Sequence, residues 1–134
     1  MVATEDLKDL AYLPGEIAYL DREINRLKRP PSLSMSRTQR KDYAAAVAEL
    51  IRLLQDRRQR CAGQLERLRV FLDSIQDDFT RDLFRLRYEK CMNWRKICSI
   101  YCARGFWYEE NSLRVMCGRC LERYNRNEAG RKNK

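Results

Sequence analysis

Cysteine is the residue type with the widest chemical scope in this sequence, which contains six cysteines and no histidine. Cys98 and Cys102 form one close pair and Cys117 and Cys120 another, and on a helix each pair would place two thiolates on one face. Four thiolates can form a closed tetrahedral zinc site. Zinc-binding pairs usually lie on turns, however, and cysteine also packs well as a small apolar residue. We therefore expect no metal or other cofactor, with a zinc site at these four cysteines as the alternative.

The same composition argues against an enzyme. Without histidine the chain cannot assemble Cys-His or Ser-His nucleophilic sites, or the common hydrolytic zinc centres. It has no glycine-rich phosphate-binding loop. The carboxylates of Asp73, Asp77 and Asp78 could hold a metal for nuclease chemistry, but acidic residues between helices far more often cap them. We expect a protein without catalytic activity.

The start of the sequence bears on where the protein works. Residues 1–6 are acidic rather than basic, and no segment reaches the length of about 18 apolar residues that a transmembrane helix needs. We therefore expect no membrane association and a cytoplasmic location. In that compartment the cysteines should be reduced thiols, and disulfide pairing is the least favoured state.

Positive charge is concentrated in the C-terminal part of the chain. Residues 1–80 contain 14 Lys and Arg against 13 Asp and Glu, whereas residues 81–134 contain 14 against 6, so the net charges are +1 and +8. A localised positive field attracts nucleic acid, because each neutralised phosphate releases condensed counterions. The alternatives are an ordinary basic surface and a basic tail, and we expect residues 129–134 to form a disordered basic tail.

The positions of the helices follow from the apolar pattern. Charged residues make up 35% of the chain, with only five Gly and three Pro, which favours long amphipathic helices and an all-α fold. Steps of three and four predict helices at about 15–29 and 36–74, separated by a break at Pro30-Pro31. The predicted seam contains Leu10, Leu13, Ile17, Leu20, Ile24 and Leu27, then Ala44, Val47, Ile51, Leu54, Arg58, Cys61, Leu65, Leu68, Leu72 and Ile75.

The two long helices should form one region, residues 1–75. They could fold back as a helical hairpin, or two chains could pair as a coiled coil through the longer helix, and we favour a homodimer. Arg58 lies in the seam, which is tolerable near a helix end or opposite an acid.

Residues 76–128 should form a second region of three shorter helices. Phe79, Leu83 and Leu86 mark a helix ending near Lys90. Asn93 is a predicted N-cap for a short helix with Trp94, Ile97 and Tyr101 on its apolar face, and a final helix should run from about 111 or 112 to 126. The last two helices are typical of a helix-turn-helix, whose second helix would enter the major groove of DNA.

Two short segments within this region carry a family resemblance. Residues 86–97, LRYEKCMNWRKI, resemble the "LRY, short turn, W-x-x-I" signature of sigma factor region 4, and residues 118–121, GRCL, look like the "GRAL" segment of its recognition helix. The layout is similar to phage and prophage transcription regulators of the ArpU and RinA kind. The resemblance implies sequence-specific binding of double-stranded DNA at a phage promoter in a bacterial host, with RNA polymerase as a further partner.

The expected contacts follow from the two faces of the final helix. Burial of its apolar face would leave six base-edge candidates exposed: Asn111, Ser112, Arg114, Val115, Gly118 and Arg119. Arginine can bridge the O6 and N7 acceptors of guanine, and Gly118 permits close backbone approach. Contacts to phosphates position a protein on the duplex but do not read its base sequence. The candidates for such contacts are Arg95, Lys96, Arg104 and Arg126. For each of these side chains, an ordinary solvated charge is the competing interpretation.

One segment departs from the family pattern. Cys102–Glu110 is about six residues longer than the usual tight turn and includes Phe106, Trp107 and Tyr108. It could form a small lobe packed on the domain, or displace the final helix, or offer its aromatic rings to a partner or to single-stranded nucleic acid. We expect Trp94, in contrast, to be a core anchor. An adaptor that binds RNA polymerase or another phage or host protein through the helical hairpin is the second functional hypothesis.

Overall fold

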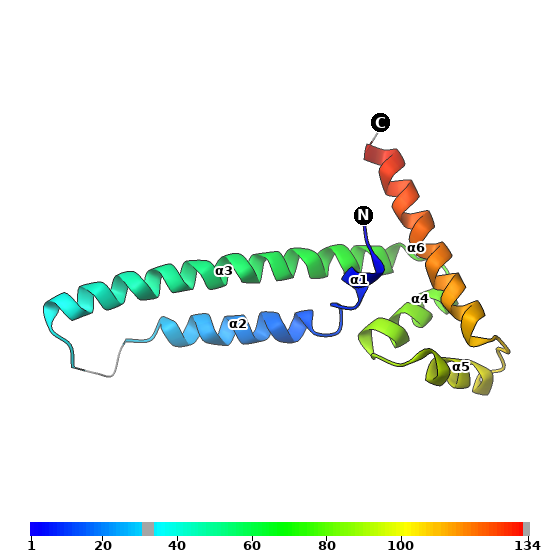
Figure 1. Cartoon of the computed structure of the whole chain (residues 1–134), viewed down its shortest axis with the longest axis horizontal. Helices are drawn as coiled ribbons and strands as arrows, with labels where there is room; N and C mark the ends of the chain where they lie inside the picture. Colours follow the sequence, from blue (N-terminus) through cyan, green and yellow to red (C-terminus); the bar gives the residue numbers. More distant parts are fainter. Residues whose placement is uncertain (31–33, 133–134) are drawn as a thin grey trace. The chain divides into compact units, whose positions relative to one another are not determined.

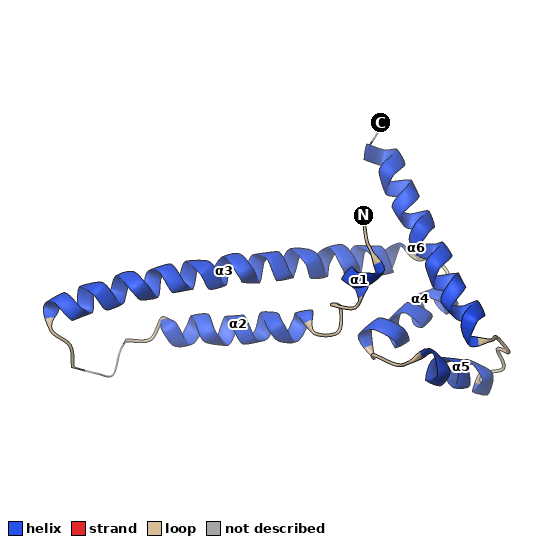
Figure 2. Ribbon diagram, in the orientation of Figure 1, coloured by secondary structure: helices blue, strands red, loops and turns tan. Residues whose placement is uncertain are grey.

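The computed structural model describes residues 1–30 and 34–132, and all regular secondary structure within these ranges is helical (Figures 1 and 2). This confirms the predicted all-α fold. The elements are α1 (Thr4–Leu7), α2 (Leu13–Leu27), α3 (Arg37–Ser74), α4 (Asp78–Phe84), a π-helical turn η1 (Arg85–Glu89), α5 (Trp94–Ala103) and α6 (Glu110–Lys132). They divide into a hairpin unit, Tyr12–Leu65, and a second unit formed by Met1–Ala11 with Glu66–Lys134, which we call the C-terminal unit.

In the hairpin unit α2 lies alongside the middle of α3 with opposite chain direction (Figure 1). Leu13, Leu20, Ile24 and Leu65 are buried between the two helices. The Arg58 guanidinium pairs with Asp21, so of the two situations expected for a seam arginine the structure shows the one opposite an acid. The intramolecular hairpin is therefore present, and the described contacts leave pairing between chains open as a proposal.

Local capping defines the ends of these two helices. Pro14 lies in the first turn of α2, where its missing N–H is no loss. Before α3, Ser36 and Gln39 form a reciprocal capping box: the Gln39 N–H donates to Ser36 Oγ at 3.2 Å and the Ser36 N–H to Gln39 Oε1 at 3.0 Å. Part of the loop predicted at Pro30-Pro31, residues 31–33, lies outside the described residues.

The boundaries between the units differ from those expected. α3 continues past Glu66 into the C-terminal unit, so residues 66–75 do not belong with the hairpin. The short helix α1 was not predicted, and it places Leu7 and Leu10 in the core of the C-terminal unit rather than in the hairpin seam. Ala44, also assigned to the seam, is exposed. The spacing of the apolar residues could not show these exceptions, because apolar residues at steps of three and four define one face of a helix but not which other helix packs against that face.

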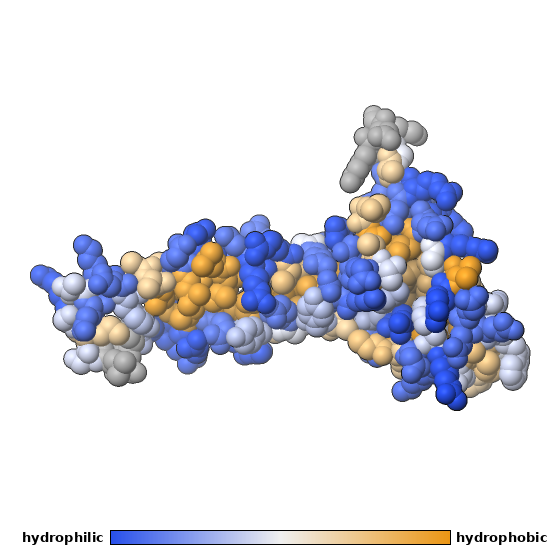
Figure 3. Space-filling model, viewed as in Figure 1, coloured by the Kyte–Doolittle hydropathy of each residue, from blue (hydrophilic) through white to orange (hydrophobic). Residues whose placement is uncertain are grey.

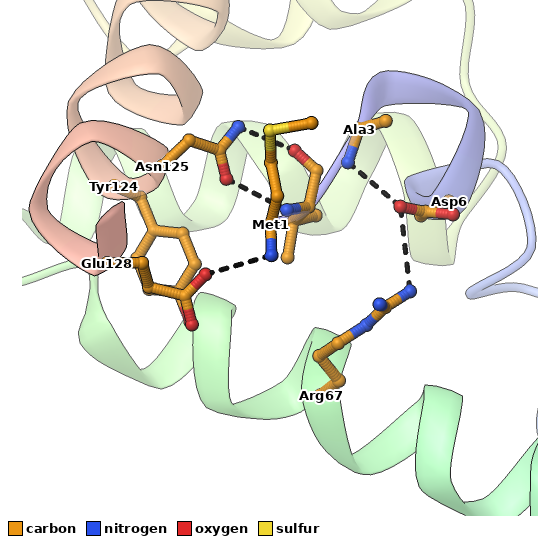
Figure 4. A network of polar contacts seen from close by, with 8 residues as sticks. Met1, Ala3, Asp6, Arg67, Tyr124, Asn125 and Glu128 are labelled. Atoms are coloured by element: carbon orange, nitrogen blue, oxygen red, sulfur yellow. Dashed lines mark hydrogen bonds and ion pairs between the residues drawn. The ribbon is translucent and has the colours of Figure 1, made fainter. Parts of the chain in front are cut away.

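The N-terminal residues are fixed against α6 by polar contacts (Figure 4). The Val2 N–H donates to Asn125 Oδ1 at 2.8 Å, and Asn125 Nδ2 donates to the Val2 carbonyl at 2.7 Å. The Val2 side chain is fully buried. The Asp6 carboxylate accepts from the Ala3 N–H and lies 3.6 Å from Arg67 on α3. These contacts join α1, α3 and α6 within one core.

The final helix is longer than predicted. α6 extends to Lys132 rather than ending near residue 126, so residues 129–132 are helical and the expected disordered tail is wrong for them, while residues 133–134 lie outside the described range. The Asn125 contact with Val2 anchors the last predicted turn of the helix, and residues 127–132 extend beyond it. None of the described helices combines the length and apolar character needed to cross a membrane.

Candidate nucleic-acid interface

The helix before the predicted helix-turn-helix begins at a strong cap. Asp77 accepts hydrogen bonds from the N–H groups of Phe79 and Thr80, both at 3.3 Å, and from the Thr80 hydroxyl at 2.6 Å. The Thr80 hydroxyl bond is the largest of the effects that lower the pKa of Asp77. α4 then passes into the π-helical turn η1, so the single helix expected over this segment changes its winding near its end. Asp77 thus acts as a cap, the role that sequence reasoning favoured over metal binding.

The start of α5 is fixed by the residues that carry the family resemblance. Asn93 is the N-cap, as predicted, and its side chain accepts from the Lys96 N–H at 2.8 Å. Cys91 adopts a positive φ of 56° in the preceding turn, a conformation uncommon for residues other than glycine. Trp94 is only 8% exposed, so its predicted place in the core is confirmed.

Two arginines flank the Trp94 ring. The guanidinium carbon of Arg87 lies 5.3 Å from the ring centroid, and that of Arg114 lies 5.9 Å from it, both within cation–π range. Arg87 also donates to the Met92 carbonyl at 3.0 Å. Trp94 therefore connects the end of η1, the start of α5 and the first turns of α6. It holds Arg114 near the N-terminus of α5.

The long turn between α5 and α6 begins with a regular helix stop. Gly105 has φ 90°, its N–H donates to the Cys102 carbonyl at 3.0 Å, and the Phe106 N–H donates to the Tyr101 carbonyl at 2.8 Å. This is a Schellman motif, in which glycine takes the left-handed position. The sequence signal was present, since a glycine followed by an apolar residue after a helix is typical of this ending.

The remaining aromatic residues of the turn pack back on the domain. Phe106 and Tyr108 lie 5.1 and 5.4 Å from Phe79 between ring centroids, and Phe79 lies 4.6 Å from Tyr101. The Tyr101 hydroxyl donates to the Phe79 carbonyl at 3.0 Å. Trp107, in contrast, is 83% exposed. Phe106 and Tyr108 remain 39% and 43% exposed. Of the alternatives for this segment, the structure shows a small lobe packed on the domain.

Arg104 belongs to this aromatic cluster. Its guanidinium lies 5.4 Å from the Tyr101 ring and 5.6 Å from the Phe106 ring. It caps the C-terminal end of α5, whereas Arg95 and Lys96 lie in the first turn, roughly one helix length of 15 Å away. The structure therefore separates Arg104 from the other phosphate candidates of α5.

α6 has the two faces that the sequence predicted. Leu113, Cys117 and Leu121 are buried. The six base-edge candidates, Asn111, Ser112, Arg114, Val115, Gly118 and Arg119, are all exposed. A Cβ built on Gly118 would meet nothing within 4 Å, so internal packing does not explain a glycine in the middle of this helix. Arg126 is also exposed, two turns after Arg119.

The cysteines of this unit differ in burial: Cys117 is buried, Cys98, Cys102 and Cys120 are half-buried, and Cys91 is exposed. Burial raises the pKa of the Cys117 thiol to about 12 and raises that of Cys120. Cys98 Sγ contacts the Tyr108 carbonyl at 3.0 Å, and its pKa is also raised, chiefly by desolvation. Within the described ranges no three Cys, Asp or Glu side chains are grouped so that they could hold a metal ion. The arrangement of Cys98, Cys102, Cys117 and Cys120 gives the zinc alternative no support.

Comparisons of the chain with protein-family models, curated proteins and solved structures give no match. Any functional proposal therefore depends on the positions and contacts of the chain's own residues. The structure brings Arg114 to the start of α5, beside the turn that carries Arg95 and Lys96, and leaves this surface exposed.

Proposed function

We propose that the chain is a sequence-specific double-stranded DNA-binding protein that docks the N-terminal half of α6 in the major groove, as a phage or prophage transcription regulator would. The observation that carries this proposal is the exposed face of α6 around Gly118. In a helix interior glycine is about 1 kcal/mol less favourable than alanine, and nothing in the C-terminal unit fills the space beside it. Gly63 and Gly130 are equally open, so Gly118 permits the close approach of a duplex to this face but does not by itself require it.

The first turn of α5 supports the same surface. Helix N-termini favour negative charge, yet this turn contains no acidic residue and carries Arg95 and Lys96. Within the described chain neither side chain forms an ion pair. Two cations at the positive end of a helix are unfavourable for the free protein and favourable beside a phosphate, which the backbone N–H groups of the turn would also bind.

Selection of bound duplexes from a random pool, followed by titration of a selected duplex at several salt concentrations, tests the proposal. Replacing Arg95 and Lys96 by alanine should weaken binding of every duplex and lower the salt slope by about 1 for each lost phosphate contact. Arg114→Ala should in addition relax sequence choice. The matched control is the adjacent exposed pair Arg40 and Lys41 on α3, whose replacement should leave affinity nearly unchanged.

Two outcomes would contradict this assignment. One is the absence of duplex binding by the unmodified protein at low salt. The other is an equal loss of affinity in both pairs of alanine variants, because that result would indicate a diffuse effect of net charge rather than a defined interface.

The hairpin unit supports a homodimer. Leu50 and Leu53 are 44% and 51% exposed on α3, and Tyr43 lies on the same side of the helix two turns earlier. Figure 3 shows apolar side chains gathered over the hairpin on the visible face. A second copy placed antiparallel on this stripe would set Leu50 against Leu53 of the other chain, a self-complementary contact of the kind that two-fold dimers use. The stripe is about 15 Å long, which suits a weak dimer.

Sedimentation equilibrium over a range of concentrations tests the dimer. The unmodified chain should show a mass that rises toward twice the monomer, and Leu50→Glu with Leu53→Glu should remain monomeric. Val70→Glu is the control, because Val70 is an equally exposed apolar residue of α3 outside the stripe. A monomeric mass for the unmodified chain at high concentration would exclude the dimer.

A further inference from the structure

A groove of about 800 Å³ lies in the C-terminal unit, between the end of α3 with the turn into α4 on one side and α6 on the other. Its apolar floor is formed by the half-buried side chains of Met116, Cys120 and Tyr124, with the buried residues Phe71 and Ile75 beneath them. The volume is in the range of pockets that bind organic ligands, and apolar surface of this kind is the usual floor of a binding groove. The proposed DNA contact does not use it.

The rim of the groove is positively charged. Arg119, Arg123 and Arg131 line it, and none of the three forms an ion pair among the described residues. The two acids that also line it are engaged: Asp77 caps α4, and Glu128 accepts from the Tyr124 hydroxyl and lies 3.2 Å from the Met1 amine (Figure 4). Three arginines against two carboxylates leave the rim with a net positive charge above an apolar floor.

We infer that this groove binds an acidic amphipathic helix of a partner protein. The lining side chains of α6 run from Met116 to Arg131, a length of about 22 Å, which matches a peptide helix of about 15 residues. A helix with apolar residues at i, i+3 or i+4, and i+7 would place them on the floor and its carboxylates against the arginines. A duplex does not fit this feature, because its backbone has no apolar face to cover Met116, Cys120 and Tyr124.

The groove and the proposed DNA surface lie on different sides of α6. Met116, Cys120 and Tyr124 recur at spacings of four and belong to the groove, whereas Val115 and Gly118 do not line it. Arg119 is the exception, since it lines the groove and is also a base-edge candidate. The two surfaces therefore permit a partner protein and a duplex on the same helix, and the groove does not depend on DNA binding being correct.

Fluorescence anisotropy with a labelled synthetic peptide tests the inference on the full chain. The probe is a peptide of about 16 residues with leucine at heptad positions a and d and glutamate at most others; a second peptide replaces each glutamate by lysine. The acidic peptide should bind saturably and the basic one should not. Arg123→Glu with Arg131→Glu should weaken binding about tenfold or more, because two attractive contacts become repulsive.

The controls separate the groove from the rest of the chain. Arg69→Glu, an exposed arginine of α3 that does not line the groove, should change peptide affinity less than about twofold. Alanine at Arg95 and Lys96 should leave peptide binding intact even where duplex binding is lost, so failure of one proposal is distinguishable from failure of the other. Circular dichroism confirms that each variant keeps its helices.

Three results would overturn the inference: no saturable binding of the acidic peptide, binding unaffected by the double charge reversal, or equal binding of the basic peptide. A single-stranded oligonucleotide provides the remaining arm. The groove is a nucleic-acid site instead if this oligonucleotide binds and loses its affinity in the variant with Arg123→Glu and Arg131→Glu. It must also displace the acidic peptide at a concentration far below that at which the peptide itself binds.

Discussion

Cys117 provides a direct test of whether the cysteines of the C-terminal unit are core residues. Its side chain is buried on α6, and burial raises the pKa of its thiol from an ordinary 9.0 to about 12. The perturbation is Cys117→Ala, which removes the titrating group and leaves a small apolar side chain. A zinc-bound thiolate would have a lowered pKa, so the two interpretations predict opposite behaviour.

The sign and size of the effect follow from linkage. Because the folded pKa is raised, the stabilisation from the protonated thiol is fully present below pH 9 and is lost as the pH rises from 9 toward 12. At pH 10 the loss is about 1.4 kcal/mol. At pH 7 the alanine variant should be about 1 kcal/mol less stable than the unmodified chain, because a buried sulfur is lost. At pH 10 that difference should largely disappear.

The assay is urea unfolding under reducing conditions at both pH values. Trp94 and Trp107 both lie in the C-terminal unit, so tryptophan fluorescence reports this unit specifically. Tyr101, whose pKa burial raises to about 12, loses stabilisation in both proteins and cancels in the comparison. An unchanged gap between the two proteins from pH 7 to pH 10 would refute the reasoning. A stability that a chelator lowers at pH 7 would restore the zinc interpretation.

Two further substitutions test single contacts. Gly118→Ala should raise the stability of the C-terminal unit by up to about 1 kcal/mol and weaken duplex binding. The control is Gly63→Ala in α3, where a Cβ also meets nothing within 4 Å and duplex binding should not change. Urea unfolding measures the stability and duplex titration the affinity, and unchanged duplex affinity for Gly118→Ala would contradict the proposed docking face. Asn125→Ala should destabilise the same unit by about 1–3 kcal/mol, since both hydrogen bonds to the Val2 backbone are lost; an unchanged urea midpoint would show that the N-terminal segment is not held there.

The features that the sequence predicted correctly are those set by local chemistry. The all-helical fold, the Asn93 cap and the opposite faces of α6 follow from apolar spacing and from side chains that bond to their own helix. Each of these needs information from only a few neighbouring residues or one packing rule.

The features that the sequence did not predict depend on distant contacts. Asn125 bonds to Val2 across 123 positions, and neither residue carries a local signal for the other. This contact explains why the position of the N-terminal segment that carries α1 was missed. The groove was missed for the same reason. Phe71 and Tyr124, whose ring centroids are 4.9 Å apart, come from different helices, and the apolar periodicity of each helix does not specify how the two helices pack together.

The acidic residues of α6 limit how a duplex can approach it. Glu110 lies in the first turn, where the helix dipole favours a carboxylate, so helix stability explains its presence. Glu122 is exposed one turn beyond Gly118, on the face proposed to dock, and a phosphate there would be repelled. The base-reading segment must therefore end before Glu122, unless that carboxylate accepts from a cytosine amino group. In the proposed complex, docking would then be confined to the span from Asn111 to Arg119, about 12 Å of helix, and α6 would enter the groove by its N-terminal end.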